Sequence, residues 1–158
     1  MPRVGIALGS NLGDSPAHLQ AAREGLREMA TAGEPFLQAS NHRSEPLHCP
    51  PGSPSFLNSV VEIAWEGTPS ELLEITQALE KKLGRFPKTE RNAPRVIDLD
   101  LLYFDNQTIA TETLTLPHPR ITERRFVLEP LAEIRPELVL PGQTLSVSSL
   151  ATLLDPLG

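Results

Sequence analysis

The sequence predicts an α+β fold in which two main helices cover one face of a mostly antiparallel sheet. The first observation behind this prediction is the order of the elements. The spacing of apolar residues reads as strand, helix, strand, strand, helix, strand. The second observation is that each of these elements has one apolar side, which must be buried against another element. We therefore expect a ferredoxin-like βαββαβ sandwich, with short extra helices near the C-terminus.

Length and composition favour a single domain over residues 1–158, with no second domain fused to it. Hydrophobic residues make up 39% of the chain and charged residues 22%, as in ordinary globular proteins. The formal net charge of −6 argues against a nucleic-acid partner. No signal-peptide pattern opens the chain, and no apolar run is long enough to cross a membrane. We expect a cytoplasmic monomer without membrane contact.

The first strand is predicted over residues 3–9, where aliphatic residues alternate with small ones. The aliphatic residues are Val4, Ile6 and Leu8. A glycine-bounded turn follows at residues 9–14, and its backbone N–H groups could approach a phosphate. An ordinary tight turn between a strand and a helix explains the same residues, so both interpretations stay open.

The first helix is predicted to begin with Ser15 as its N-cap and Pro16 as its first residue, and to end near Gly33. A second strand is predicted over residues 36–43. The proline-rich segment 44–55 follows it and is long enough to be a functional loop.

The third strand is predicted over residues 56–65, with Phe56 and Asn58 on the face opposite its aliphatic residues. The second helix should begin with a capping box at residues 68–71 and run to Leu83. It is followed by an irregular basic loop and then by the fourth strand.

The fourth strand lies in the stretch 91–103, RNAPRVIDLDLLY, which places Asp98 and Asp100 on one face. Two carboxylates this close need positive charge between them. A divalent metal with a phosphate ligand would supply it, and ion pairs with Arg91 and Arg95 would supply it equally well. The strand by itself does not decide between these two alternatives.

The C-terminal part begins with a short strand that ends at Pro117. A short helix is predicted to start at Thr122 and to be broken by Pro130. A last helix is expected over residues 148–154.

The expected packing would leave the polar face of the third and fourth strands free of helices. The side chains on that face are Phe56, Asn58, Asp98 and Asp100. Three proline-bearing loops can gather over it, at residues 44–55, 85–94 and 117–120. Carboxylates, an amide, an aromatic ring and loop arginines suit a Mg²⁺ site that binds a nucleotide polyphosphate.

Several motifs occur together in the order and spacing of one enzyme family. They are Gly9-Ser10-Asn11, Phe56-Leu57-Asn58, Gly84-Arg85, Pro94-Arg95-Val96-Ile97-Asp98-Leu99-Asp100 and Pro117-His118-Pro119-Arg120. With them the chain resembles the 6-hydroxymethyl-7,8-dihydropterin pyrophosphokinases. The resemblance implies transfer of diphosphate from MgATP to the pterin hydroxymethyl group, with release of AMP, in folate biosynthesis.

The resemblance also implies a role for each matching residue. Two Mg²⁺ ions would bind at Asp98 and Asp100, which would form the catalytic group with Arg85 and Arg95. ATP would be contacted by Gln77, Glu80, Arg85, Arg91, Arg95, His118 and Arg124. The pterin would be contacted by Ser44, Glu45, Leu47, Phe56, Asn58 and Phe126.

Two other functions fit the same order of elements. A palm-like nucleotidyltransferase or cyclase also uses carboxylates and two metals, but it would release pyrophosphate instead of AMP. An RNA-recognition module would need exposed aromatic residues and a basic face. The acidic chain, with 4% aromatic residues, does not favour such a module.

Overall fold

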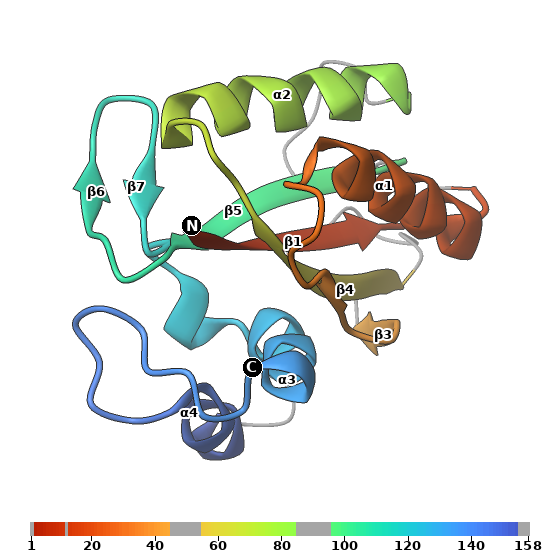
Figure 1. Cartoon of the computed structure of the whole chain (residues 1–158). Coiled ribbons are helices and arrows are strands. Elements are labelled where there is room, and N and C mark those ends of the chain that lie inside the picture. Colours follow the sequence, from red (N-terminus) through yellow and green to blue (C-terminus); the bar gives the residue numbers. More distant parts are fainter. Residues whose placement is uncertain (1, 12, 45–54, 85–95, 155–158) are drawn as a thin grey trace.

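A computed structural model describes residues 2–11, 13–44, 55–84 and 96–154 (Figure 1). These residues form an α+β fold around an antiparallel sheet, with the strand order β2-β4-β1-β5 and with β3 also paired to β4. The strands of this sheet are β1 (Arg3–Ser10), β2 (Leu37–Gln38), β3 (His42–Ser44), β4 (Phe56–Ala64) and β5 (Asp98–Phe104).

A second, two-stranded sheet joins β6 (Ile109–Ala110) to β7 (Thr115–Leu116). The helices are α1 (Ser15–Met29), α2 (Pro69–Lys82), α3 (Arg125–Ile134) and α4 (Val147–Leu153), with a 3-10 turn η1 (Ile121–Glu123) before α3. Within the described ranges, no helix combines the length and the apolar character needed to cross a membrane.

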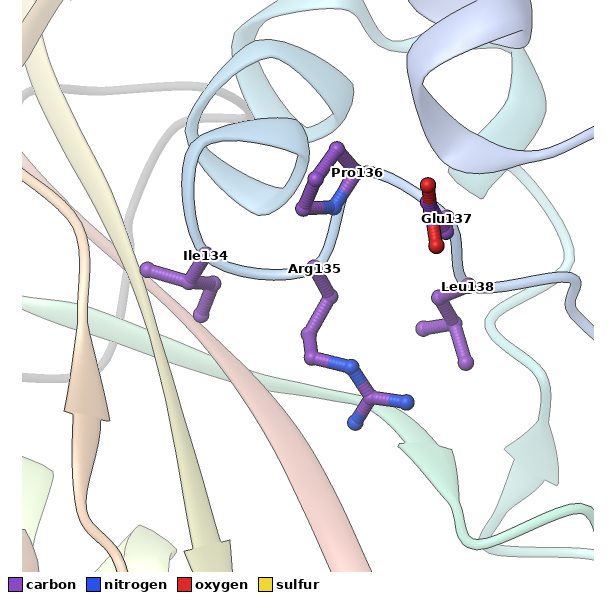
Figure 2. Close-up of a pocket in the computed structure, with 5 residues that line it drawn as sticks. All are labelled: Ile134, Arg135, Pro136, Glu137 and Leu138. Carbon is purple, nitrogen blue, oxygen red and sulfur yellow. The ribbon is translucent and has the colours of Figure 1, made fainter.

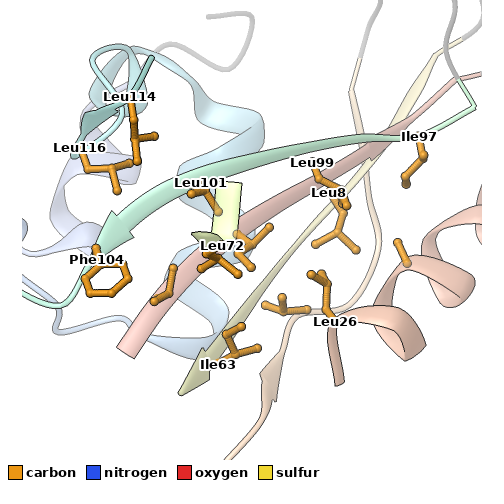
Figure 3. Packing of buried hydrophobic residues seen from close by; sticks show 14 of the residues in the cluster. Leu8, Leu26, Ile63, Leu72, Ile97, Leu99, Leu101, Phe104, Leu114 and Leu116 are labelled. Atoms are coloured by element: carbon orange, nitrogen blue, oxygen red, sulfur yellow. The ribbon is translucent and has the colours of Figure 1, made fainter. Parts of the chain in front are cut away.

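The central strand β1 determines how the two faces of the sheet differ. Its aliphatic side chains point to α1 and α2, which cover that face (Figure 1). They pack with apolar residues of β4, β5 and both helices, as Figure 3 shows. The labelled members of this core are Leu8, Leu26, Ile63, Leu72, Ile97, Leu99, Leu101, Phe104, Leu114 and Leu116. In this layer, α1 and α2 pack against the same face of the sheet.

The opposite face is only partly free, which corrects the expectation of a helix-free face. There α3 and α4 cover a second core (Figure 1). Its fully buried members include Val60, Leu128, Leu131 and Val147. The predicted break at Pro130 was therefore wrong. The proline costs α3 one backbone hydrogen bond, but the helix continues because its apolar side is buried against the sheet.

Two predicted boundaries change for local reasons. Asp14, and not Ser15, is the N-cap of α1, because its carboxylate accepts the N–H of Ala17 at 3.2 Å. The helix ends at Met29, before Gly33, and the N–H of Thr31 then donates to the carbonyl of Ala64 at 2.9 Å. The capping box and proline start of α2 are confirmed.

The predicted strand over residues 36–43 is split into β2 and β3. Between these two strands, side chains from α1 and α3 form hydrogen bonds with the backbone. Arg23 donates to the carbonyl of Ala39 at 3.1 Å, and Glu133 accepts the N–H of Ser40 at 2.7 Å. The N–H of Ala39 still donates to the carbonyl of Val60 at 2.9 Å, but side chains take the Ala39 carbonyl and the Ser40 N–H, so the regular ladder is interrupted between β2 and β3.

A polar cluster centred on the buried Glu62 lies on the second face of the sheet. Glu62, which is 1% exposed, accepts the hydroxyl of Tyr103 at 2.5 Å and also pairs with Arg3 and Arg135. Burial raises the pKa of Tyr103 well above its usual value, and the Glu62 carboxylate raises it further. The Tyr103 ring lies directly over Gly5, where a Cβ atom would overlap it.

We expect Gly5→Ala to lower the free energy of unfolding by about 1–3 kcal/mol, because the added methyl group displaces a ring that its hydroxyl hydrogen bond holds in place. Chemical denaturation measures the change. In a Tyr103→Ala background the same Gly5→Ala change should cost little. An equal cost in both backgrounds would show that the overlap is not the cause.

Candidate functional site

A row of three residues crosses β4, β1 and β5 on the polar face of the sheet, near the C-terminal end of β1. Gly9 of β1 lies opposite Asn58 of β4 on one side and opposite Asp98 of β5 on the other. Because neighbouring strands are about 4.8 Å apart, the Cα atoms of Asn58 and Asp98 are separated by about 10 Å. Gly9 has no side chain, so β1 contributes none between Asn58 and Asp98, and this missing position in the row is the gap between them.

Residues of β4 border the position that a side chain at Gly9 would occupy. A Cβ atom at this position would lie 3.5 Å from the Asn58 Oδ1 atom and 4.0 Å from Phe56 Cδ1, both ordinary contact distances. Phe56 and Asn58 therefore border the same space, as their shared face predicted. The sequence shows small residues alternating along β1, Gly9 among them. Only the strand register shows that Gly9 lies between Asn58 and Asp98.

Asp98 and Asp100 are confirmed to lie on one strand with their side chains on the same face. Both are half-buried, whereas Leu99 between them is buried in the helix-covered core. Asp100 lies opposite Ala7, again a small residue. Their carboxylates provide oxygen ligands suited to Mg²⁺.

The amide of Asn58 is oriented by β3. Its Nδ2 atom donates to Ser44 Oγ at 2.7 Å and to the carbonyl of His42 at 3.4 Å. A carbonyl can only accept, so the NH₂ group must face β3. The Oδ1 atom consequently faces Gly9 and can accept a hydrogen bond from a ligand in the gap.

Glu80 and Gln77 lie on α2 but differ in their surroundings. Gln77 is exposed. Glu80 is 5% exposed, and its carboxylate accepts the backbone N–H of Leu99 at 2.7 Å. Leu99 lies between the two aspartates, so Glu80 fixes β5 at this point. Sequence reasoning missed this contact and expected Glu80 to bind a nucleotide directly.

His118 is held next to β5, because its backbone N–H donates to the carbonyl of Leu102 at 2.8 Å. Its Nδ1 atom accepts the backbone N–H of Arg120 at 3.1 Å, so in the neutral ring the proton is on Nε2. Burial lowers the pKa of His118, and the charges of Arg124 and Arg120 lower it further. The ring is therefore a neutral donor at pH 7.

Arg124 and Phe126 lie where η1 meets α3. The Arg124 guanidinium carbon is 5.6 Å from the centre of the Phe126 ring, which is 39% exposed. The remaining expected site residues lie outside the described ranges. They are Glu45, Leu47, Arg85, Arg91 and Arg95. In the part of the chain that is described, no three His, Cys, Asp or Glu side chains converge as a metal site.

A hollow of about 340 Å³ lies elsewhere, at the C-terminal end of α3. Figure 2 shows its lining, Ile134, Arg135, Pro136, Glu137 and Leu138. Arg135 pairs with Glu62, four residues along β4 from Asn58, which is about 13 Å along a strand. The hollow therefore belongs to the other end of the sheet, and the candidate site is the row around Gly9.

Comparison with known proteins identifies similar sequences over nearly the whole chain. Residues 5–136 match the family model described as 7,8-dihydro-6-hydroxymethylpterin-pyrophosphokinase. The chain is 42% identical to the 2-amino-4-hydroxy-6-hydroxymethyldihydropteridine pyrophosphokinase of Methylorubrum extorquens, over all of this chain and 97% of the relative. It is 44% identical to the Bacillus subtilis protein of the same name, over 82% of this chain and 75% of the relative.

Solved structures support the fold. The crystal structure of Plasmodium falciparum HPPK-DHPS wild type with pteroate matches 96% of this chain with a TM-score of 0.74 and 12% sequence identity. The chain spans 42% of the length of that solved chain.

We expect Glu80→Ala to lower the free energy of unfolding by about 1–3 kcal/mol, because the buried N–H of Leu99 loses its acceptor. Amide hydrogen exchange should show faster exchange at Leu99. The matched control is Gln77→Ala on the exposed side of α2, which should stay within about 0.5 kcal/mol of the parent. Unchanged protection of Leu99 in Glu80→Ala would contradict the assignment.

Proposed function

Because the chain belongs to the 7,8-dihydro-6-hydroxymethylpterin-pyrophosphokinase family, we propose that its two substrates meet at the row around Gly9. The protein is an ATP-dependent diphosphotransferase that acts on hydroxymethyldihydropterin in folate biosynthesis. The observation that carries the proposal is the register that sets Asn58 and Asp98 on either side of Gly9. An amide that reads a heterocycle and a carboxylate that holds a metal then lie on one surface.

We interpret the sheet order β2-β4-β1-β5, with α1 and α2 on one face, as a ferredoxin-like arrangement of a single domain. The support is that β4 and β5 flank β1 antiparallel to it, while β2 and β3 together take the place of one edge strand.

Asp98 and Asp100 would hold the Mg²⁺ ions, two of which are expected from the family resemblance. The donor set fits, because two carboxylates on one strand face leave the remaining coordination positions to phosphate oxygens and water. When bound, the metal neutralises the charge of the ATP phosphates and holds them in place for transfer. Glu80 supports this part of the site by fixing Leu99 between the aspartates.

The pterin would be read by Asn58, whose Oδ1 atom is available to a ring N–H donor, with contacts from Ser44, Glu45 and Leu47. Phe56 borders the gap from β4, and Phe126 is half-exposed at the start of α3. Flat aromatic faces of this kind can enclose a planar heterocycle.

ATP would be contacted by residues from several elements. The charge of the phosphates would be neutralised by Arg124 and by the loop residues Arg85, Arg91 and Arg95. Contacts with the nucleoside are predicted for Gln77 and Glu80. His118 would donate from Nε2 as a neutral group, because its Nδ1 atom is already occupied by the N–H of Arg120. Its contribution is then a directed hydrogen bond and not a charge.

The reaction needs positioning more than it needs a nucleophilic side chain. The pterin hydroxymethyl oxygen attacks the β-phosphorus of ATP, the bond from that phosphorus to the α–β bridging oxygen breaks, and AMP leaves with that oxygen. The hydroxyl proton is released to solvent, so the balanced products are the pterin diphosphate, AMP and one proton. Holding the two substrates in line and excluding water supply most of the rate enhancement for such a transfer.

Product analysis tests the proposal. With MgATP and the hydroxymethyl dihydropterin, we expect AMP and the pterin diphosphate in equal amounts, and no AMP when the pterin is omitted. Release of pyrophosphate with incorporation of the nucleotide would instead indicate nucleotidyl transfer and would refute the assignment.

We expect Asp98→Ala and Asp100→Ala each to lower turnover at least about a hundredfold, because each removes a charged group that stabilises the transferred phosphates. The melting temperature should change little, since both side chains lie outside the apolar cores. The matched control is Glu112→Ala, an exposed carboxylate between β6 and β7, which should keep full activity. Activity retained in both aspartate variants would remove them from the site.

A further inference from the structure

We propose that Glu133 is a positioning residue for the pterin, because it ties α3 to β3 and through β3 orients the amide of Asn58. This inference rests on the proposed function, in which Asn58 and Ser44 contact the pterin. Glu133 lies in the last turn of α3 and is not itself a proposed substrate contact.

Glu133 accepts hydrogen bonds from three donors in the segment of residues 40–42, which leads from β2 into β3 and ends with His42, the first residue of β3. Its Oε2 atom accepts the backbone N–H of Ser40 at 2.7 Å, and its Oε1 atom accepts the Ser40 hydroxyl at 2.7 Å. The Nε2 atom of His42 lies 2.9 Å from the same Oε1 atom. A single carboxylate therefore fixes both the backbone and the side chains of this segment.

The helix itself gains nothing from a negative charge at this position. The C-terminal end of a helix carries a partial negative charge, so a carboxylate in the last turn of α3 is mildly unfavourable for helix stability. Burial also raises the pKa of Glu133, but hydrogen bonds from Ser40 and His42 outweigh this effect and lower the pKa below its usual value. The charged form is thus held by its partners on the neighbouring segment.

The next strand, β3, connects this segment directly to the side-chain amide of Asn58. His42 lies opposite Asn58 in the β3–β4 ladder, and Ser44 lies opposite Phe56. The Asn58 NH₂ group donates to Ser44 Oγ and to the His42 carbonyl, so the position of β3 sets the direction of Asn58 Oδ1. If β3 moves, the acceptor that faces Gly9 moves with it.

The same helix carries the other predicted pterin contact. Phe126 lies in the first turn of α3, and Glu133 lies in its last turn. Because α3 packs on the sheet as a rigid element, the Glu133 contact fixes β3 relative to Phe126 as well. Glu133 therefore sets the spacing between the amide side and the ring side of the pterin site.

The test is equilibrium binding of the pterin, followed by its fluorescence, in the presence of a non-hydrolysable ATP analogue. We expect Glu133→Ala to raise the pterin Kd about tenfold, by analogy with the roughly 10–100-fold losses that follow removal of hydrogen-bond partners of metal ligands. The Kd of the ATP analogue should stay unchanged. In steady-state kinetics the KM for the pterin should rise more than kcat falls.

Three further variants separate positioning from general destabilisation. Glu133→Gln should restore most of the pterin affinity, because its amide oxygen still accepts the N–H of Ser40. Ser40→Ala, a milder change, should raise the pterin Kd in the same direction by a smaller factor. The control Glu129→Ala removes an ion pair with Arg125 inside α3 and should bind the pterin like the parent.

A double-mutant cycle identifies the route. In an Asn58→Ala background, Glu133→Ala should have little further effect on the pterin Kd. An effect of Asn58→Ala with none of Glu133→Ala, or equal losses for ATP and pterin, would overturn the positioning role alone. No effect of Asn58→Ala would overturn the proposed pterin site and this inference together.

Discussion

The alternation of side chains along β1 is the constraint on which the other features depend. Val4, Ile6 and Leu8 pack under α1 and α2, and small residues occupy the other face. Each small residue makes room for something different. Gly5 accommodates the ring of Tyr103, and Gly9 leaves the gap between Asn58 and Asp98. A larger side chain at either position would alter the second face without disturbing the first.

Contacts from neighbouring elements hold the residues on both sides of Gly9 in place. On the β4 side, Ser44 and the His42 carbonyl orient the amide of Asn58. On the β5 side, the buried carboxylate of Glu80 binds the N–H of Leu99, between the two aspartates. Side chains that are already held in place lose less conformational entropy when a ligand binds. Asn58 and Asp98 therefore belong to a preorganised binding surface.

Local sequence patterns predicted the parts of the fold that depend on local spacing. The period-two pattern correctly paired Phe56 with Asn58 and Asp98 with Asp100 on shared faces, because side-chain alternation is a property of the strand itself. It could not predict that α3 runs past a proline, because burial against the sheet decides that outcome. The break between β2 and β3 was equally hidden, since Ser40 and Glu133 are 93 residues apart.

In the proposed site, metal-bound ATP and the pterin meet across Gly9. The most direct measurement is a crystal structure with Mn²⁺ in place of Mg²⁺, a non-hydrolysable ATP analogue and the hydroxymethyl dihydropterin. We expect anomalous scattering from Mn²⁺ beside the carboxylates of Asp98 and Asp100, and a pterin ring N–H within hydrogen-bond distance of Asn58 Oδ1. Metal bound away from these carboxylates, or a pterin that does not contact Asn58, would contradict the claim.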